Sequence, residues 1–184
     1  YDIRPDMVTC AKQLSSGYLP ISALMISEKI YDVFKEQSRK HGAFGMGYTY
    51  GGHPVSCAVA LETLKIYEER DMIGHVQSVA PHFLERLSEL SDSSIVGEAR
   101  GVGLIAALEL VSDKSSRAQF SPDAKAAPAI AASALARGLV VRALPGDVIG
   151  ICPPLIIENT QVDELFDKLA AAVTETEGLL RKAA

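Results

Sequence analysis

The order of apolar and polar residues along the chain predicts a mixture of short strands and amphipathic helices. Two apolar, partly β-branched segments, 5–11 (PDMVTCA) and 21–27 (ISALMIS), are bounded by proline and glycine and are predicted to be short buried strands. From Ser27, a good helix-capping residue, apolar side chains recur at helical spacing and predict an amphipathic helix over 27–37. The following stretch, 41–54, contains five glycines and is predicted to be a loop.

A second group of elements follows this loop. Pro54 suits the first turn of a helix, and because 55–69 is apolar on more than one face we expect a buried helix there. Another helix is predicted over 72–91, and two strands over 94–111, joined by a turn at 99–103 (ARGVG). The apolar stripe of the 72–91 helix consists of Ile73, Val76, Val79, Phe83 and Leu87.

The last third of the chain predicts two more helices with strands between them. An alanine-rich helix over 121–138 ends at Gly138, a typical C-terminal capping residue. Strands over 139–144 and 148–154 come next, and a final helix covers about 159–181.

These elements fall into two groups, which predict two domains. Residues 1–70 hold too few strands to form a sheet alone and are typical of the end of a larger α/β domain. Residues 71–184 predict a compact small α+β domain. We therefore expect the chain to begin in the middle of a domain.

Composition and charge narrow the function classes. The net charge of −5 gives no general attraction to nucleic acid or to an anionic membrane. No apolar run approaches the roughly 20 residues of a membrane-spanning helix, and the first residues lack the pattern of a signal peptide. We expect a soluble, cytoplasmic protein. The three scattered cysteines are predicted to be reduced, and the four histidines lack metal-ligand spacing, so no metal is predicted.

Lys12 is the first candidate for chemistry. It lies in CAKQLSSGYLP (10–20), after an apolar run and before a small, hydroxyl-rich turn. A lysine at this position either extends its ammonium to water, as surface lysines do, or acts as a covalent catalyst that attacks a carbonyl group. In the second interpretation Ser15, Ser16 and Gly17 let the side chain move during turnover.

Two further segments carry candidate anion-binding groups. In GYTYGGHP (47–54) the Thr49 hydroxyl and the glycine backbone precede a helix, which is typical of a phosphate site but also of a tight turn. Arg142 in LVVRAL either clamps a carboxylate or is an ordinary surface arginine. Arg100 is predicted to be structural, tying loop carbonyls together, and His53 to form hydrogen bonds within its loop.

Taken in order, four motifs resemble the C-terminal part of class III aminotransferases, which are pyridoxal 5'-phosphate (PLP) enzymes of fold type I. The motifs are PDMVTCAKQLSSGYLPISALMIS, GYTYGGHPVSCAVALETLKIYEE, EARGVGLIAALELV and GLVVRALPGDVIGICPPLIIENTQVDELFDKL. Their resemblance is greatest to the omega-amino acid:pyruvate and amine:pyruvate branch. It implies an α/β fold in which 1–70 end the large PLP-binding domain and 71–184 form the small C-terminal domain.

The resemblance also implies roles for individual residues. Lys12 is implied to form the Schiff base with PLP and to move the substrate proton, and Thr49 to bind the PLP phosphate of the neighbouring subunit in a homodimer with a shared active site. Arg142 resembles the mobile arginine that accepts a substrate carboxylate, and Tyr18 matches a family tyrosine after the lysine turn. The implied substrates are an amine or amino acid and a keto acid such as pyruvate.

This chain departs from the family pattern in two ways. Gln13 and Gly51 stand where the family more often has glycine and serine. The segments that bind the pyridine nitrogen, stack on the ring and form the glycine-serine phosphate loop precede the region of resemblance. We therefore expect 1–184 to be the C-terminal part of a longer transaminase and to be inactive alone. The alternatives are a fragment that only dimerises or binds a partner, and another class III PLP activity such as decarboxylation or a 1,2-amino shift.

Overall fold

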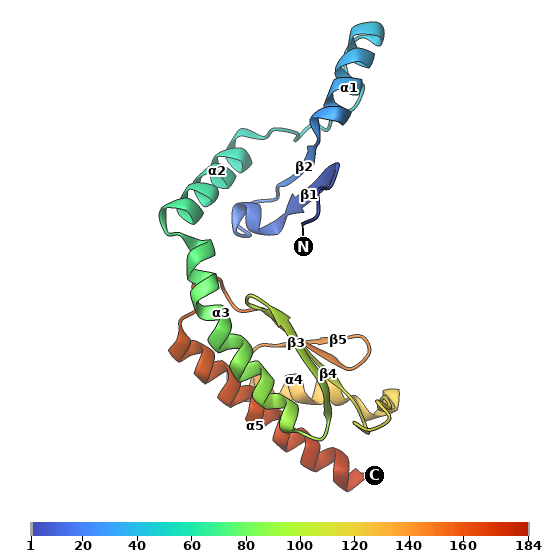
Figure 1. Ribbon diagram of the computed structural model, residues 1–184, viewed down its shortest axis with the longest axis vertical. Helices are drawn as coiled ribbons and strands as arrows, with labels where there is room; N and C mark the ends of the chain where they lie inside the picture. The colour runs from blue at the N-terminus through green and yellow to red at the C-terminus, as the bar shows by residue number, and fades with distance from the viewer. Residues whose placement is uncertain (1, 184) are drawn as a thin grey trace. The chain divides into compact units, whose positions relative to one another are not determined.

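The computed structural model describes residues 2–183, and contacts within the chain divide it into two compact units (Figure 1). The N-terminal unit is Tyr1–Asp71 and the C-terminal unit is Met72–Ala184. The sequence placed this division between residues 70 and 71. Within the described residues, no helix combines the length and the apolar character needed to cross a lipid bilayer.

The N-terminal unit consists of a two-stranded ribbon and two helices. Strands β1 (Met7–Ala11) and β2 (Ser22–Ile26) pair antiparallel and are joined through a short 3-10 helix, η1 (Lys12–Ser15). Helix α1 (Glu28–His41) follows β2, and after the predicted glycine-rich loop helix α2 (Pro54–Glu69) packs on η1. The predicted starts of both helices are confirmed.

The prediction that β1 and β2 are buried is wrong for this chain. Met7 and Val8 are successive residues, so their side chains point to opposite faces of the ribbon, yet they are 58% and 38% exposed. Among residues 2–183, no third strand pairs with the ribbon. Both faces of the ribbon therefore remain open, and its apolar sequence is not matched by burial in this chain.

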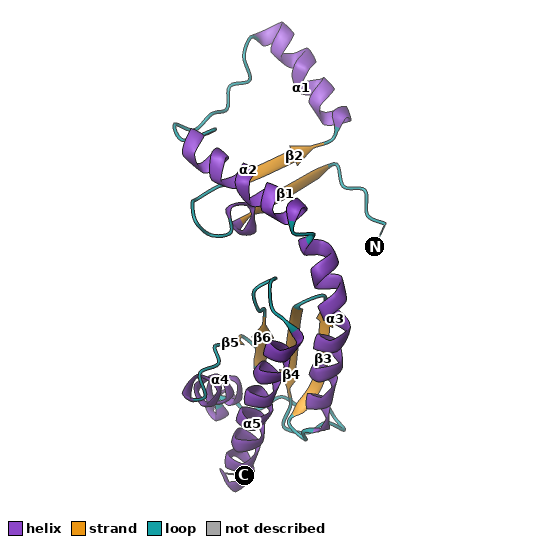
Figure 2. Cartoon of the chain, turned by 90° about the vertical axis from the view of Figure 1, so that its left-hand side faces the viewer, coloured by secondary structure: helices purple, strands orange, loops and turns teal. Residues whose placement is uncertain are grey.

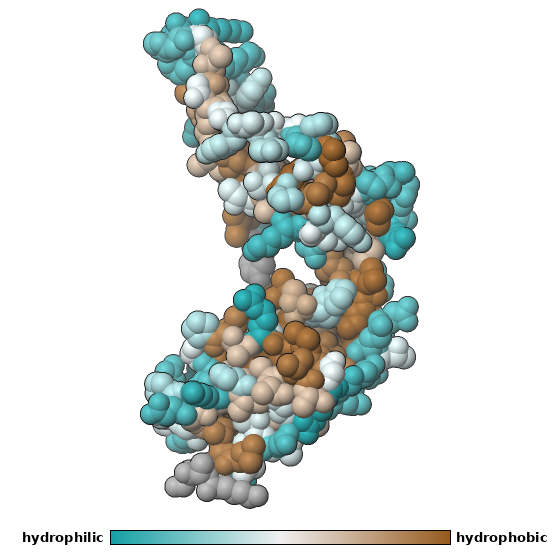
Figure 3. All heavy atoms as spheres, turned by 180° about the vertical axis from the view of Figure 1, so that it is seen from behind, coloured by the Kyte–Doolittle hydropathy of each residue, from teal (hydrophilic) through white to brown (hydrophobic). Residues whose placement is uncertain are grey.

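The two helices of this unit are also largely exposed. No residue of α1 is buried, and in α2 only Ala60 and Thr63 are, so the expected burial of the 55–69 helix is also wrong. Figure 3 shows hydrophobic residues at the surface of this unit. The large exposed apolar residues on the two helices are Tyr31, Val33, Phe34, Val55, Leu61 and Leu64.

The C-terminal unit is built on a four-stranded antiparallel sheet. Its strands are β3 (Val96–Val102), β4 (Ile105–Leu110), β5 (Arg142–Leu144) and β6 (Val148–Ile151), arranged in the order β3-β4-β6-β5. The connection between β5 and β6 is short, whereas a long segment containing a helix separates β4 from β5.

Three helices cover one face of this sheet. They are α3 (Met72–Glu89), α4 (Ala126–Ala136) and α5 (Asn159–Ala183), and Figure 2 shows α3 and α5 crossing that face. Phe83 of α3 and Phe166 of α5 meet edge to face, with ring centroids 5.1 Å apart, and both are almost fully buried. This packing makes the core of the unit, and within residues 2–183 no helix covers the other face of the sheet.

Several predicted details of the C-terminal unit need correction. The β3–β4 turn lies at residues 103 and 104, where Gly103 has a φ of +58°, and not over 99–103. The strand expected over 139–144 pairs only from Arg142 onward. Ile73 is 73% exposed although it belongs to the predicted apolar stripe, because it lies in the first turn of α3, ahead of the part that packs on the core.

An ionic network joins α3 to α5 at the surface of the C-terminal unit. Arg86 donates hydrogen bonds to Asp163 at 2.6 Å, to Asp167 at 2.7 Å and to Glu89 at 2.9 Å. His82 Nε2 lies 2.8 Å from the same Asp163 carboxylate. The hydrogen bonds from His82 and Arg86 hold the pKa of Asp163 below its ordinary value. The ionised form of Asp163 is therefore favoured in the folded state.

We predict that Asp163→Asn destabilises the protein at pH 7 and has less effect in acid. Because the pKa of Asp163 is lowered on folding, its contribution to stability is present above the ordinary aspartate pKa of about 3.9 and is lost as the pH falls through the lowered value. Chemical denaturation at pH 7 and at pH 3 measures this difference. Asp123→Asn, at an exposed carboxylate, is the control. Equal destabilisation by Asp163→Asn at both pH values would contradict the prediction.

Candidate functional site

Lys12 begins the turn that follows β1. Its backbone has a φ of +54°, in the left-handed region that non-glycine residues rarely occupy. The side chain is exposed, so the expected position beside a buried strand is not observed in this chain. Among residues 2–183, no side chain forms an ion pair or hydrogen bond with its amine. The structure thus presents an unpaired amine on a strained backbone, and backbone strain of this kind is often found at functional positions.

The turn after Lys12 is anchored rather than loose. Ser15 is only 1% exposed, and its hydroxyl donates a 2.6 Å hydrogen bond to the backbone carbonyl of Leu19. The Gly17 amide donates to the Lys12 carbonyl at 3.3 Å, with Gly17 at a φ of +78°. Ser15 therefore fixes the backbone and does not add flexibility, contrary to the sequence-based interpretation.

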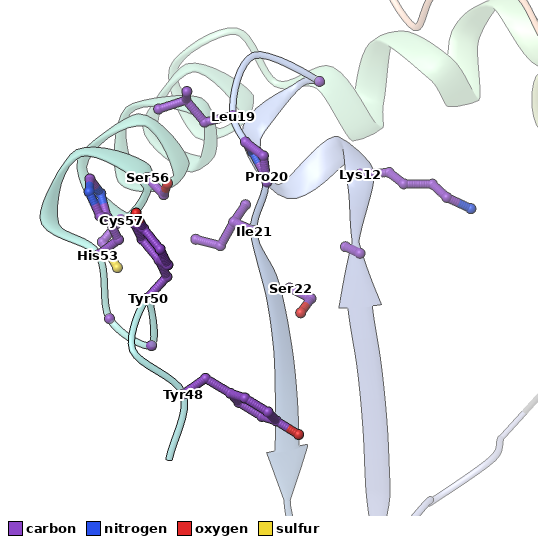
Figure 4. Close-up of a pocket in the computed structure, with 14 residues that line it drawn as sticks. Lys12, Leu19, Pro20, Ile21, Ser22, Tyr48, Tyr50, His53, Ser56 and Cys57 are labelled. Atoms are coloured by element: carbon purple, nitrogen blue, oxygen red, sulfur yellow. The ribbon is translucent and has the colours of Figure 1, made fainter.

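An open pocket of about 820 Å³ lies between this turn and the glycine-rich loop (Figure 4). Its walls come from residues 11–22 on one side and 48–57 on the other, and they include Lys12, Tyr48 and Tyr50. In Figure 4 the Lys12 side chain extends away from the labelled side chains of the second wall. Neither tyrosine was predicted from the sequence to belong to a site. Aromatic residues inside a glycine-rich loop were the available signal.

The glycine-rich loop is shaped by its own backbone. The Gly51 amide donates a 2.8 Å hydrogen bond to the Tyr48 carbonyl, so it is already used within the turn. Gly52 has a φ of +69°, a conformation that suits glycine. Thr49 is exposed and is not among the residues that line the pocket. The structure of this chain therefore does not bring Lys12 and Thr49 together in one site.

His53 carries a polar atom without a partner in the pocket wall. Its Nδ1 is buried, and within residues 2–183 it has no hydrogen-bond partner, so the hydrogen bond expected of its ring in the loop is not formed at this atom. The ring stacks on Tyr50, with centroids 5.7 Å apart. A buried ring nitrogen without a partner is a group that a ligand can satisfy. No cluster of three or more His, Cys, Asp or Glu side chains in the described residues is placed to hold a metal ion.

Arg142 lies in a different pocket, on the open face of the sheet in the C-terminal unit. Strand register aligns Arg100 with Ala107, Ala107 with Gly150, and Gly150 with Arg142. Residues paired in this way share a face, so two arginines flank a floor made of alanine and glycine. These four residues help to line an open, largely apolar pocket of about 850 Å³.

The two arginines of this row differ in their partners. Arg100 forms ion pairs with Glu109 at 2.8 Å and with Glu98 at 3.3 Å. Arg100 was predicted to tie loop carbonyls together. That prediction is wrong, because Arg100 lies within β3 and pairs with carboxylates of strand residues. Arg142 is exposed and has no ion-pair or hydrogen-bond partner among residues 2–183. Arg142 is therefore the guanidinium that is available to a carboxylate.

Comparison with known proteins relates the chain to one family of enzymes. A family model described as Aminotransferase class-III matches residues 1–173. A probable gamma-aminobutyrate transaminase 3, mitochondrial, of Oryza sativa subsp. indica is 48% identical over 177 residues, which is 96% of this chain and 34% of the relative. Gamma aminobutyrate transaminase 1, mitochondrial, of Solanum lycopersicum is 45% identical with the same coverage. The chain thus spans about a third of the length of these curated relatives.

Solved structures give the same relationship. A structure described as a transaminase with L-ala is 44% identical, with a TM-score of 0.93 over 97% of this chain and 42% of that chain. The PMP-bound form of an aminotransferase from Vibrio fluvialis is 34% identical, with a TM-score of 0.92 over 96% of this chain and 39% of that chain. The similarity therefore extends over nearly the whole of the present chain in both sequence and structure.

We predict that Ser15→Ala loosens the turn that carries Lys12. The substitution leaves the Leu19 carbonyl without the hydroxyl that now donates to it, and losing such a hydrogen bond costs about 1 kcal/mol. Amide hydrogen exchange over residues 16–19 is expected to become faster, with a matching loss of unfolding free energy. Ser22→Ala, at an exposed strand position, is the control and leaves both unchanged. Unaltered exchange in Ser15→Ala would show that the hydroxyl does not hold the turn.

Proposed function

The chain belongs to the class-III aminotransferase family, and from this we propose that the protein containing it is a PLP-dependent transaminase. It transfers an amino group from an amine or omega-amino acid to a keto acid such as pyruvate. The observation that carries this proposal is the unpaired amine of Lys12 in the wall of an open pocket. Two relatives are named gamma-aminobutyrate transaminases, and gamma-aminobutyrate is an omega-amino acid, which supports the class of amino donor.

The predicted fold class is confirmed: the chain has the α/β fold of the fold type I PLP-dependent transferases. The assignment of the two units within that fold is a proposal. We assign the N-terminal unit to the end of the large PLP-binding domain and the C-terminal unit to the small domain. The apolar residues on both faces of the β1–β2 ribbon support the first assignment, since strands that are apolar on both faces are typical of a sheet whose two faces are covered by helices.

The groups around the first pocket suit PLP chemically. The cofactor carries an aldehyde, a phosphate and ring hydrogen-bonding groups. Lys12, whose amine is unpaired, the His53 Nδ1 and the aromatic ring of Tyr50 all belong to residues that line the pocket, and the Lys12 side chain, which extends away from the other two in Figure 4, would have to turn toward them. When bound, PLP supplies an electron sink that stabilises negative charge on the substrate carbon that loses a proton. These donors therefore fit the cofactor, although they form only part of the site that it requires.

Lys12 has two tasks in this proposal. Its unprotonated Nζ would hold the cofactor covalently through the aldehyde carbon, with loss of water. Once the substrate amine has displaced it, the same Nζ would accept the proton from the substrate carbon and return a proton to the product side. Both tasks need an amine that no neighbouring carboxylate holds as an ammonium ion, and within the described residues no carboxylate pairs with Lys12.

Thr49 would serve the neighbouring subunit of a homodimer with a shared active site. It is exposed and lies outside the pocket that Lys12 lines, which suits a hydroxyl that binds the phosphate of another copy's cofactor. The exposed apolar residues of the N-terminal unit support a large contact surface of this kind. The same surface also favours the alternative function, in which the chain by itself only dimerises or binds a partner without catalytic activity.

Arg142 would bind the substrate carboxylate. Its guanidinium is exposed and unpaired, while Arg100 at the other end of the row is held by two glutamates. A planar guanidinium can bind a carboxylate by donating two parallel hydrogen bonds.

The cytoplasmic location is likewise our proposal; the two plant relatives named above are called mitochondrial.

We predict that Lys12→Ala in the full-length protein abolishes the covalent link to PLP. Borohydride reduction followed by intact mass and peptide mapping should find a pyridoxyl-phosphate adduct on the Lys12 peptide of the wild type and none in the variant. Transaminase turnover should fall by at least about 100-fold, because the lysine is the general acid and base. Lys65→Ala, on the exposed side of α2, should keep both adduct and turnover. Normal turnover of Lys12→Ala would refute the proposed function.

We predict that Arg142→Ala weakens the binding of substrates that carry a carboxylate. Losing a charge-assisted hydrogen-bond pair should raise KM for an omega-amino acid by roughly 10-fold to 100-fold. The KM for an amine without a carboxylate should change little, because it does not use the guanidinium. Arg39→Ala, on exposed α1, is the matched control. An equal loss for both classes of donor would contradict this role.

A further inference from the structure

The turn that carries Lys12 contains two residues with an unfavourable backbone. Lys12 has a φ of +54° and Ser16 a φ of +51°, and of the three left-handed residues only Gly17 adopts this region without steric cost. Such a conformation persists only where surrounding contacts hold it. A residue that contacts the turn from another element can therefore help to hold the backbone of Lys12.

Tyr67 of α2 supplies that contact. Its hydroxyl donates a 3.0 Å hydrogen bond to the backbone carbonyl of Gln13, which is the residue after Lys12. The Ser16 amide donates to the same carbonyl at 3.2 Å, and a carbonyl oxygen has two lone pairs and can accept both. Within the described residues, the hydrogen bond from a side chain of another element to the η1 backbone comes from Tyr67.

Tyr67 also connects the turn to the opposite wall of the pocket. Helix α2 begins at Pro54, directly after the loop that contributes Tyr48, Tyr50 and His53 to that wall, and it packs on η1. Residues 54 and 67 are separated by 13 helical steps, which span about 20 Å. A single helix therefore extends from the glycine-rich loop to the backbone beside Lys12. Tyr67 is not among the residues that line the pocket.

We propose that Tyr67 is a positioning residue for Lys12. Its hydroxyl fixes the Gln13 carbonyl, and with it the turn in which Lys12 has its left-handed backbone, so that the Cα–Cβ bond from which the Lys12 side chain reaches the cofactor is held in one orientation. The inference deepens the proposed function and rests on it, because the direction of Nζ matters only if Lys12 holds PLP. The chemistry remains with Lys12, and Tyr67 acts through the backbone of Gln13.

The test is Tyr67→Phe in the full-length protein, which removes the hydroxyl and keeps the ring. Apoprotein is mixed with PLP, and the growth of the borohydride-reducible adduct on the Lys12 peptide is followed in time. We expect formation to be about threefold to tenfold slower, the change that one hydrogen bond commonly makes. Amide exchange over residues 13–18 should become faster, while the melting temperature stays near that of the wild type. Tyr31→Phe, on exposed α1, is the matched control and should change none of these.

Three results would overturn the inference. The first is an adduct that forms in Tyr67→Phe as fast as in Tyr31→Phe. The second is slow formation accompanied by a large drop in melting temperature and faster exchange throughout the N-terminal unit, which would indicate general destabilisation. The third is a wild-type protein that forms no adduct on Lys12, and that result alone would also refute the proposed function.

Discussion

The alternation of side chains across a β-strand governs where the candidate functional residues of this chain lie. In the C-terminal unit three helices cover one face of the sheet, so Leu108 of β4 and Ile149 of β6 are buried. The residues next to them along each strand face outward. Arg142, Gly150, Ala107 and Arg100 form a row on that outward face only because the registers of three strand pairs agree. A shift of one residue in any pair would move an arginine toward the core, where a guanidinium cannot stay unpaired.

In the N-terminal unit the same alternation leaves apolar side chains exposed on both faces of the β1–β2 ribbon, because neither face is covered within the described residues. Its strands carry the apolar residues of a buried sheet, and its turn places an amine at the strand end, where the backbone leaves extended geometry at Lys12. Ser15 and Tyr67 hold that turn from two sides, one through the Leu19 carbonyl and the other through the Gln13 carbonyl. The amine is exposed and unpaired within the described residues, whereas hydrogen bonds hold the backbone that carries it.

This combination suits a transaminase. A lysine that must hold a cofactor, release it and then transfer a proton needs a flexible side chain on a fixed base. An unpaired arginine on the open face of the other unit suits a substrate that carries a carboxylate. The chain spans about a third of the length of the curated relatives named above, and both of its pockets are open.

The sequence alone determined the element types, the family and the candidate residues Lys12, Thr49 and Arg142, because helical periodicity, glycine placement and ordered motifs are local signals. It misjudged burial in β1, β2 and α2, since apolar sequence reports what a segment would pack against and not whether this chain supplies it. Tertiary structure decided the pairing of Arg100 with strand glutamates and the bond from Tyr67 to Gln13. Both contacts depend on strand register and helix packing, and no local pattern of residues encodes a contact between positions 54 residues apart.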